Sequence, residues 1–438
     1  RQEGPEDDDR RPHALDQLVR RLGGDLGRPG VPLDGTVRVS GAKNSVLKLM
    51  AATLLAEGTH VLRNVPRIAD VETMADLLTS MGVDVARDAD TLTIRRPPEI
   101  TPEAPYELVE RMRASIVVLG PLLAACGQAC VSMPGGDDFG SRPVDDHLTG
   151  LEALGAGFQL NHGVIEGRAP ALIGERIVLE VPSHTATDTI LMAAVRAKGV
   201  TVIENAAREP EVADLAALLN RMGARIVGAG TSTITVEGVD ELSPADHEAI
   251  PDRVEAATFL AAVAVAGGEI TLHGARHDHM DMLLAKLGEM GLRTSPTCDG
   301  VWAAAPRRLT SADVSTLPYP GIATDYKPLL MSVLAVSEGV GIVTENLYGA
   351  NRFNYVNELV RMGADIRIQG HHAVVRGVER LSAAPVKAHD LRAGAGLVVA
   401  GLGADGETVV ADGWHIDRGY DDLAGKLRHL GADVRRER

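Results

Sequence analysis

The stretch Met192–Ile226, MAAVRAKGVTVIENAAREPEVADLAALLNRMGARI, decides the fold because its pattern recurs along the chain. An apolar run ends at Gly199, and the β-branched segment Val200–Ile203 that follows predicts a strand. Apolar residues with helical spacing come next and end on the Met-Gly pair at Gly223. The same order occurs in two further stretches, Ala51–Val85 and Met331–Ile366. A repeated unit that contains both helix and strand indicates an α/β fold.

Paired glycines indicate six such units. The glycines that precede the predicted strands are about seventy residues apart, at Gly58, Gly127, Gly199, Gly268, Gly339 and Gly406. The glycines that follow the predicted helices are Gly82, Gly155, Gly223, Gly291, Gly363 and Gly431. A glycine in this second place is typical of a helix C-terminus, where φ is positive. Because repeats of this length exceed the common solenoids, we predict two similar lobes of three repeats each.

Composition limits the classes of protein to which the chain can belong. Its 438 residues carry a formal net charge of −16, which excludes nucleic acid as a partner but not a small anionic substrate. The cysteines Cys126, Cys130 and Cys298 follow neither disulfide nor metal spacing, and we predict no metal. The absence of a signal-like start and of a long apolar run predicts a cytoplasmic protein with no membrane partner. Residues 1–29 are highly charged, so we expect a disordered tail.

Two segments carry residues suited to binding and chemistry. Lys43 and Asn44 follow a predicted strand and precede a predicted helix, whose N-terminus favours an anion. Alone, this pattern fits a solvated lysine at a strand end as well. The loop Pro134–His147 is longer than the corresponding turns of other repeats, which favours a functional role. Its titratable residues are Asp137, Asp138, Arg142, Asp145 and His147.

Four arginines lie near the starts of predicted helices, at Arg113, Arg352, Arg392 and Arg418. Any one of them could simply cap or solvate its helix. If the lobes bring them together, they would bind a small polyanion, because a guanidinium group can hold carboxylate or phosphate through two hydrogen bonds. Asp325 lies at a corresponding turn, and we interpret it as a candidate base.

Together these segments resemble the UDP-N-acetylglucosamine enolpyruvyl transferases, from about Val31 to the C-terminus. The motifs that carry the resemblance include SGAKN, RNVPRIADVETM, MRAS, PGGDDFGSRPVDDH, ENAAREPEVADLA, PDRVEAATFLAA, DLRAGAGLV and HIDRGY. The resemblance implies two inverted α/β lobes, each of three βαβαββ repeats, with the site in the cleft between them. The lobe crossings would fall near Lys43 and Asp252. One lobe would then comprise residues 44–251, and the other residues 30–43 plus 252–438.

The resemblance also implies roles for residues that hold the donor, phosphoenolpyruvate, which is a co-substrate; no cofactor is expected. Lys43, Arg142 and Arg418 would hold its phosphate, Arg352 and Arg392 its carboxylate, with Arg113 supporting the site and His415 near the reacting phosphate. Asp325 would take the proton of the acceptor hydroxyl. Asp137 stands where many members of the family carry a cysteine that donates a proton.

For the acceptor, a uridine nucleotide, the implied contacts lie in several segments. Asn44 would contact its sugar, and the run from Arg142 through Pro143, Val144 and Asp145 to His147 would border uracil and ribose. Ser183 and Leu347 complete the implied substrate contacts. The predicted reaction is enolpyruvyl transfer by addition and elimination with phosphate release, which the family uses to start peptidoglycan precursor synthesis.

The chain departs from the family pattern at the cysteine position. A carboxylic acid at Asp137 can also donate a proton, provided that its pKa is raised. A carboxylate attacks an epoxide much more slowly than a thiolate does. We therefore predict that fosfomycin does not inactivate this enzyme.

Further departures lie on the acceptor side. The family loop S-x-G-A-T-E-N is here Ser183–Thr189, in which Thr185 replaces a glycine. The family's F-P-T-D-x-Q is here Ile322–Lys327, and Asn346–Asn351 is one residue longer than usual. Three hypotheses remain for the chain. It transfers to the 3-hydroxyl of UDP-N-acetylglucosamine, it transfers to the 3′-hydroxyl of UMP in nucleoside-antibiotic biosynthesis, or it is a non-catalytic binding paralogue.

Overall fold

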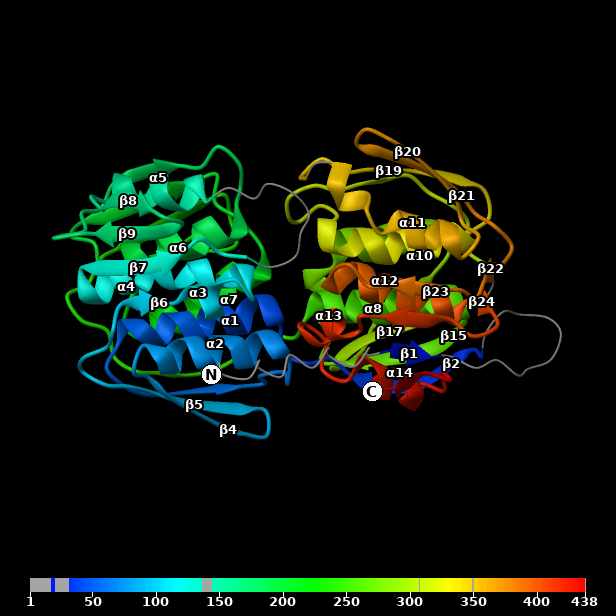
Figure 1. The fold of residues 1–438 in the computed structure, drawn as a ribbon, viewed down its shortest axis with the longest axis horizontal. Helices are drawn as coiled ribbons and strands as arrows, with labels where there is room; N and C mark the ends of the chain where they lie inside the picture. The colour runs from blue at the N-terminus through cyan, green and yellow to red at the C-terminus, as the bar shows by residue number, and fades with distance from the viewer. Residues whose placement is uncertain (1–16, 20–30, 136–143, 307, 349, 438) are drawn as a thin grey trace, which may run out of the picture.

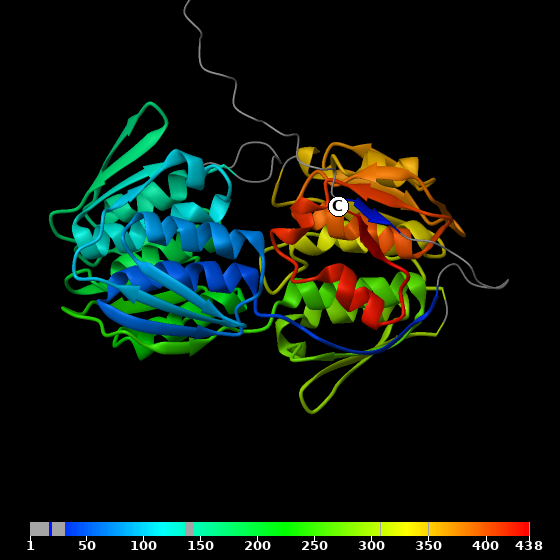
Figure 2. The same cartoon turned by 60° about the horizontal axis from the view of Figure 1, so that its bottom comes forward.

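The computed structural model describes residues 17–19, 31–135, 144–306, 308–348 and 350–437. The protein consists of two α/β lobes that lie side by side (Figures 1 and 2). One lobe, called here the inserted lobe, has a hydrophobic core formed by buried residues between Val46 and Ala249. The other, called here the discontinuous lobe, has a second core, built from Leu33–Val39 together with residues between Val254 and Val434. The predicted architecture of two lobes with three repeats each is confirmed.

Each repeat contributes one four-stranded sheet with a common order. In the first sheet, β14 (Asp246–Glu248) runs parallel to β3 (Gly58–Arg63), and β5 (Thr91–Arg96) and β4 (Asp84–Asp88) complete an antiparallel ladder. The other two sheets of the inserted lobe are β6 (Glu103–Ala104), β7 (Gln128–Ser132), β9 (Val164–Arg168), β8 (Gly157–Asn161), and β10 (Arg176–Val178), β11 (Val200–Glu204), β13 (Thr233–Glu237), β12 (Arg225–Val227).

The sheets of the discontinuous lobe repeat this order. They are β2 (Leu33–Arg38), β15 (Gly268–His273), β17 (Gly300–Ala305), β16 (Arg293–Pro296); then β18 (Val314–Ser315), β19 (Val340–Thr344), β21 (His372–Arg376), β20 (Asp365–Gln369); and β23 (Pro385–Lys387), β25 (Val409–Ala411), β1 (Gln17–Val19), β26 (Arg435–Glu437). A short pair, β22 (Leu381–Ser382) and β24 (Ala404–Asp405), lies between repeats. Every anchor and closing glycine of the predicted repeats has a positive φ, as the sequence pattern requires.

Strand β1 differs from the disordered tail predicted for residues 1–29. It pairs antiparallel with both β25 and β26, and so occupies the place that the second hairpin strand fills in the other sheets. The last sheet therefore takes this strand from a segment far earlier in the chain and not from its own repeat. Backbone hydrogen bonding to two open edges requires no side-chain pattern in the strand that fills the gap, which is why composition gave no sign of it.

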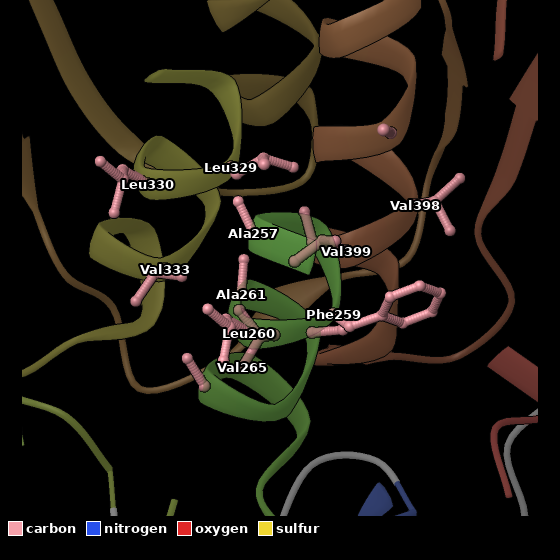
Figure 3. Close-up of a cluster of buried hydrophobic side chains, with 14 of the residues drawn as sticks. Ala257, Phe259, Leu260, Ala261, Val265, Leu329, Leu330, Val333, Val398 and Val399 are labelled. Carbon is pink, nitrogen blue, oxygen red and sulfur yellow. The ribbon is translucent and has the colours of Figure 1, made fainter. Parts of the chain in front are cut away.

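The first helix of each repeat lies in the middle of its lobe. These helices are α1 (Lys43–Ala52), α4 (Leu119–Cys126), α6 (His184–Ala194), α8 (Arg253–Ala266), α10 (Lys327–Val336) and α12 (Leu391–Leu402). Every residue of α8 is buried, including the charged Arg253 and Glu255 of its first turn. The residues that follow are almost all apolar, as expected for a helix surrounded by other elements. Figure 3 shows Ala257, Leu260 and Ala261 of α8 against Leu329 of α10 and Val399 of α12.

Shorter or amphipathic helices cover the sheets and connect the repeats. They are α2 (Ala69–Ser80), α3 (Tyr106–Val109), α5 (Asp145–Ala153), α7 (Pro210–Arg221), α9 (Asp281–Met290), α11 (Val356–Arg361), α13 (Trp414–Asp417) and α14 (Leu423–His429). Short 3₁₀ helices lie at η1 (Thr53–Leu55), η2 (Arg113–Val118), η3 (His277–His279), η4 (Thr324–Tyr326) and η5 (Ala350–Phe353). Over the described ranges, no helix is long and apolar enough to cross a membrane.

The two chain crossings between the lobes run side by side. The amide of Ala42 donates to the carbonyl of Ile250 at 2.7 Å, and the amide of Asp252 donates to the carbonyl of Ser40 at 2.8 Å. A Cβ at Gly41 would lie 1.7 Å from the backbone oxygen of Asn64, so only glycine fits there. The close backbone contact fixes where α1 and α8 begin, and with them the first residues of the candidate site.

Candidate functional site

Lys43 and Asn44 begin α1 directly after the lobe crossing. Asp252 caps α8 by accepting hydrogen bonds from the amides of the next turn, and its other oxygen accepts the amide of Lys43 at 3.2 Å. One carboxylate therefore fixes the starts of two helices in different lobes. The Lys43 ammonium lies 2.8 Å from Asp70 Oδ2, and its side chain is 10% exposed. Asn44 is partly exposed beside it.

Asp70 is a residue that the sequence reasoning did not single out. It lies in the first turn of α2, and its other oxygen accepts from Arg418 Nε at 3.0 Å. Arg418 belongs to the discontinuous lobe, so this pair joins the two lobes. Burial favours a raised pKa for Asp70, but Lys43 and Arg418 outweigh it and hold the pKa below its usual value. Two of the cations predicted to hold phosphate thus share one carboxylate.

A second carboxylate gathers the two arginines predicted to hold the donor's carboxylate. Asp325 in η4 accepts from Arg352 Nη2 through Oδ1 and from Arg392 Nε through Oδ2, both at 3.2 Å. Both arginine side chains are 4% exposed, and that of Asp325 is 28% exposed. Burial alone would raise the pKa of Asp325, but Arg392, Arg352 and then Arg253 lower it to about 2. Asp325 is therefore an ionised carboxylate at neutral pH, the form required of a base.

A buried ion pair lies behind Asp325. Lys327 and Glu345 are each 0% exposed and lie 2.8 Å apart. Burial lowers the pKa of Lys327 to about 8, although Glu345 opposes the shift. Thr324 donates to Glu345 Oε2 at 2.8 Å and accepts from Arg352 Nε at 3.3 Å. The remaining donors to Glu345 are the Thr316 hydroxyl and the amides of Leu347 and Tyr348. Glu345 therefore connects the lengthened segment before Arg352 to the turn that carries Asp325.

Some of the residues predicted for the acceptor, Asp145 and His147 of α5 and Ser183 before α6, lie at the starts of these two helices. His147 of α5 is buried, with Nδ1 3.0 Å from the Thr189 hydroxyl and Nε2 3.2 Å from the Thr185 hydroxyl. Burial, and then Arg113, lower the pKa of His147 to about 3, so the ring is neutral. Ser183 caps α6 by accepting the amide of Ala186 at 3.4 Å.

The remaining predicted residues are placed as follows. Arg113 begins η2 and donates to the carbonyl of Pro134 at 3.4 Å. His415 of α13 stacks on Trp414 with ring centroids 3.7 Å apart. Leu347 is 38% exposed. Val144 is buried immediately before α5, which begins at Asp145; Asp137, Arg142 and Pro143 lie outside the described residues.

Sequence reasoning missed Asp70 and Glu345, although both lie in quoted motifs or next to them. An acidic residue in the first turn of a helix is common for reasons of the helix dipole, so Asp70 carried no distinctive signal. In the parts of the chain that the structure describes, no group of three or more His, Cys, Asp or Glu side chains could hold a metal ion.

Comparison with known proteins identifies the family. Residues 28–427 match the family described as EPSP synthase (3-phosphoshikimate 1-carboxyvinyltransferase). The UDP-N-acetylglucosamine 1-carboxyvinyltransferase of Myxococcus xanthus is 51% identical over 412 residues, covering 93% of this chain and 98% of that protein. The enzyme of that name from Corynebacterium jeikeium is 49% identical, covering 93% of this chain and 97% of its own.

Solved structures have the same fold. The enolpyruvyl transferase NikO from Streptomyces tendae superposes with a TM-score of 0.85 at 25% identity, covering 97% of this chain and 99% of that one. EPSP synthase from Acinetobacter baumannii superposes with a TM-score of 0.73 at 18% identity, covering 97% of this chain and 100% of that one, and supports the fold alone. From its relatives and its architecture, the chain belongs to the UDP-N-acetylglucosamine 1-carboxyvinyltransferase family of enolpyruvyl transferases.

Proposed function

We propose that this enolpyruvyl transferase moves the enolpyruvyl group of phosphoenolpyruvate to the 3-hydroxyl of UDP-N-acetylglucosamine and releases phosphate. The observation that carries the proposal is the arrangement of four cations around two carboxylates. Lys43 and Arg418 share Asp70, and Arg352 and Arg392 share Asp325. Cations in two separate groups suit a donor with a phosphate at one end and a carboxylate at the other.

The binding of such a donor would prepare Asp325 for its role as a base. In the structure, Asp325 is paired with Arg352 and Arg392, and a carboxylate with a pKa of about 2 is a weak proton acceptor. A substrate carboxylate that engages these arginines weakens their hold on Asp325 and brings a like charge close to it. Both effects raise the pKa of Asp325 toward neutrality, where proton abstraction is more effective.

The proposed chemistry uses these groups together with Asp137 and Arg142, whose roles are taken from the family resemblance. The acceptor oxygen loses its proton to Asp325 and bonds to C2 of the donor, while C3 gains a proton; we assign that proton to Asp137. In the tetrahedral ketal that forms, the C2–O bond to phosphate then breaks while C3 gives a proton back to Asp137, which restores the C2–C3 double bond. Lys43 and Arg418, together with Arg142, stabilise the negative charge of the departing phosphate, and the proton held by Asp325 leaves with the phosphate or to solvent. All atoms of both substrates end in the enol ether product and inorganic phosphate.

The acceptor assignment rests on the similarity to enzymes named for UDP-N-acetylglucosamine, which is twice as high in identity as that to NikO. Two of the residues that depart from the family loop, Thr185 and Thr189, hydrogen bond to His147 within the lobe. These departures therefore have internal partners and do not require a different acceptor. We place the reaction in the cytoplasm, at the start of peptidoglycan precursor synthesis.

Phosphate release tests the proposal. Purified protein is mixed with phosphoenolpyruvate and either UDP-N-acetylglucosamine or UMP. We expect release only with the first acceptor, loss of release in Asp325→Ala, and normal release in Asp299→Asn, a change at an exposed aspartate of the same lobe. Release only with UMP would identify the smaller acceptor instead, and release with neither would support a non-catalytic paralogue.

A further inference from the structure

Helices α1 and α6 bring a lysine, a histidine and an aspartate together inside the inserted lobe. Lys48 Nζ lies 2.5 Å from His184 Nε2 and 2.8 Å from Asp188 Oδ2. The side chains of Lys48 and Asp188 are 3% and 0% exposed, whereas that of His184 is 19% exposed. His184 is therefore the member of this trio through which the other two can act on a ligand.

The contact with Lys48 fixes the tautomer of His184. An ammonium group has only hydrogens to donate, so Nε2 must accept and its lone pair must be free. The ring proton then lies on Nδ1, which becomes a donor. Burial, and next the charge of Lys48, lower the pKa of His184 well below its usual value, which keeps the ring neutral. Across the described residues, Nδ1 has no hydrogen-bond partner.

His184 also lies beside the residues of the candidate site. It follows the cap residue Ser183 and precedes Thr185, which contacts His147. The discontinuous lobe reaches the same region through Arg253, whose Nε donates to Glu211 at 2.9 Å and whose Nη1 donates to the Tyr326 hydroxyl at 3.1 Å. Tyr326 directly follows Asp325 in η4.

The charges that act on His184 come from four elements. They are Lys48 of α1, Glu211 of α7, Arg253 of α8 and Asp325 of η4. Two of these elements, α8 and η4, belong to the opposite lobe, so charges of both lobes act on the ring. The positive end of α6 and the ammonium behind the ring favour a negatively charged oxygen in front of it.

We propose that His184 is a specificity-determining residue that donates its Nδ1 hydrogen to a phosphate oxygen of the nucleotide acceptor, with Lys48 and Asp188 as positioning residues. The inference rests on the proposed function. It assigns a role to the side chain at the variable position of the family loop S-x-G-A-T-E-N, where the resemblance implied none. It also explains the placement of a lysine and an aspartate in the core, since together they hold the histidine in one tautomer.

Two substitutions at His184 with opposite expectations test the proposal. His184→Leu removes the donor, and should raise the KM for the acceptor about ten- to a hundredfold, because a hydrogen bond to a charged group is lost. The KM for phosphoenolpyruvate should change by less than about threefold, as expected for a contact that only the acceptor makes. His184→Asn places an amide N–H near the Nδ1 position and should restore most of the acceptor affinity. His60→Leu, at a buried histidine of the same lobe bonded to backbone, is the matched control and should lower stability without changing either KM.

A double variant tests the same inference if His184→Leu does not fold. Lys48→Met/Asp188→Leu keeps His184 but removes both of its partners. The pKa of His184 should then rise, so that the KM for the acceptor becomes dependent on pH between about 5.5 and 7.5. In the wild type, the same KM should show no such titration, because the ring stays neutral throughout.

The outcomes separate this inference from the function on which it rests. Wild-type turnover of UDP-N-acetylglucosamine with an unchanged acceptor KM in His184→Leu would overturn the role of His184 alone. So would an equal rise of both KM values, or a failure of asparagine to restore affinity. Absence of wild-type turnover with this acceptor would overturn both proposals.

Discussion

The buried pair Lys327–Glu345 should respond very differently to neutralisation of one partner or the other. In Lys327→Gln, Glu345 keeps its hydrogen bonds from two threonine hydroxyls and two backbone amides. In Glu345→Gln, the ammonium of Lys327 stays fully buried, and its remaining contact is the ring of Phe353, 3.9 Å from Nζ. The carboxylate is satisfied without the lysine, but the lysine is not satisfied without the carboxylate.

The structure sets the size of the two effects. Lys327→Gln removes one charged hydrogen bond, at a cost of about 1.5 kcal/mol in the free energy of unfolding, the low end of the range for such a bond because Glu345 keeps its other donors. Glu345→Gln leaves an uncompensated buried charge, at a cost of about 3–5 kcal/mol, of which the aromatic ring recovers a part. At roughly 2–4 °C per kcal/mol for a lobe of this size, Glu345→Gln should lower the melting temperature by roughly 6–20 °C.

The pH dependence adds a second signature. The folded pKa of Lys327 is about 8, below its ordinary value of 10.5, and loss of Glu345 lowers it further. Between the lowered folded pKa of the variant and pH 8, the unfolded variant binds about one more proton at Lys327 than the folded variant does, whereas the wild type gains no such difference there; the stability of the variant therefore rises with pH relative to the wild type. The difference in the free energy of unfolding between the wild type and Glu345→Gln should therefore become smaller as pH increases from 6 to 8. Denaturant unfolding of the wild type and of both variants at these pH values measures the free energy of unfolding. Equal destabilisation by the two substitutions would refute the reasoning.

Three further predictions concern the candidate site. Asp70→Asn should lower the melting temperature, because Lys43 and Arg418 lose their shared carboxylate. Added inorganic phosphate should raise the melting temperature of this variant more than that of the wild type. An equal effect of phosphate on both proteins would count against a phosphate site there. Fosfomycin should leave the wild type active and inactivate Asp137→Cys with time, whereas rapid stoichiometric inactivation of the wild type would contradict the prediction. Asp325 has a folded pKa of about 2, below its ordinary 3.8. Its ionisation should therefore add at most about 2 kcal/mol to the free energy of unfolding above pH 4, and this contribution should be lost as the pH falls from 4 to 2. Urea unfolding over that range should show this loss in the wild type and not in Asp325→Asn.

The repeats could be predicted from the sequence because their signals are local. Each unit carries its own glycines and its own change from a strand period to a helix period, and every predicted glycine has the expected positive φ. Strand β1 could not be predicted, because its partners lie about four hundred residues away and bind its backbone rather than its side chains.

The candidate site likewise contains residues that could be predicted from the sequence and residues that could not. Lys43, Arg352, Arg392, Arg418 and Asp325 were predicted from motifs, and the structure places them in two groups. The partners of these residues were not predictable, since a buried contact depends on which helices meet. In the sequence, Asp70 is an ordinary acidic residue in the first turn of a helix, and Lys48 is an ordinary lysine within a helix. Only the folded structure shows that Asp70 contacts Arg418 and that Lys48 contacts His184. Lys327 was noted as a departure, but its neutralising partner Glu345 was not.

Because β1 belongs to the last sheet, the sheets of the two lobes can form at different times during synthesis on the ribosome. All three sheets of the inserted lobe are complete once β14 has been synthesised, so this lobe can fold while later residues are still being made. Strand β1 is made before every other described strand but gains its partners only with β25 and β26, about four hundred residues later. Among the described strands, the earliest one thus waits longest for its partners.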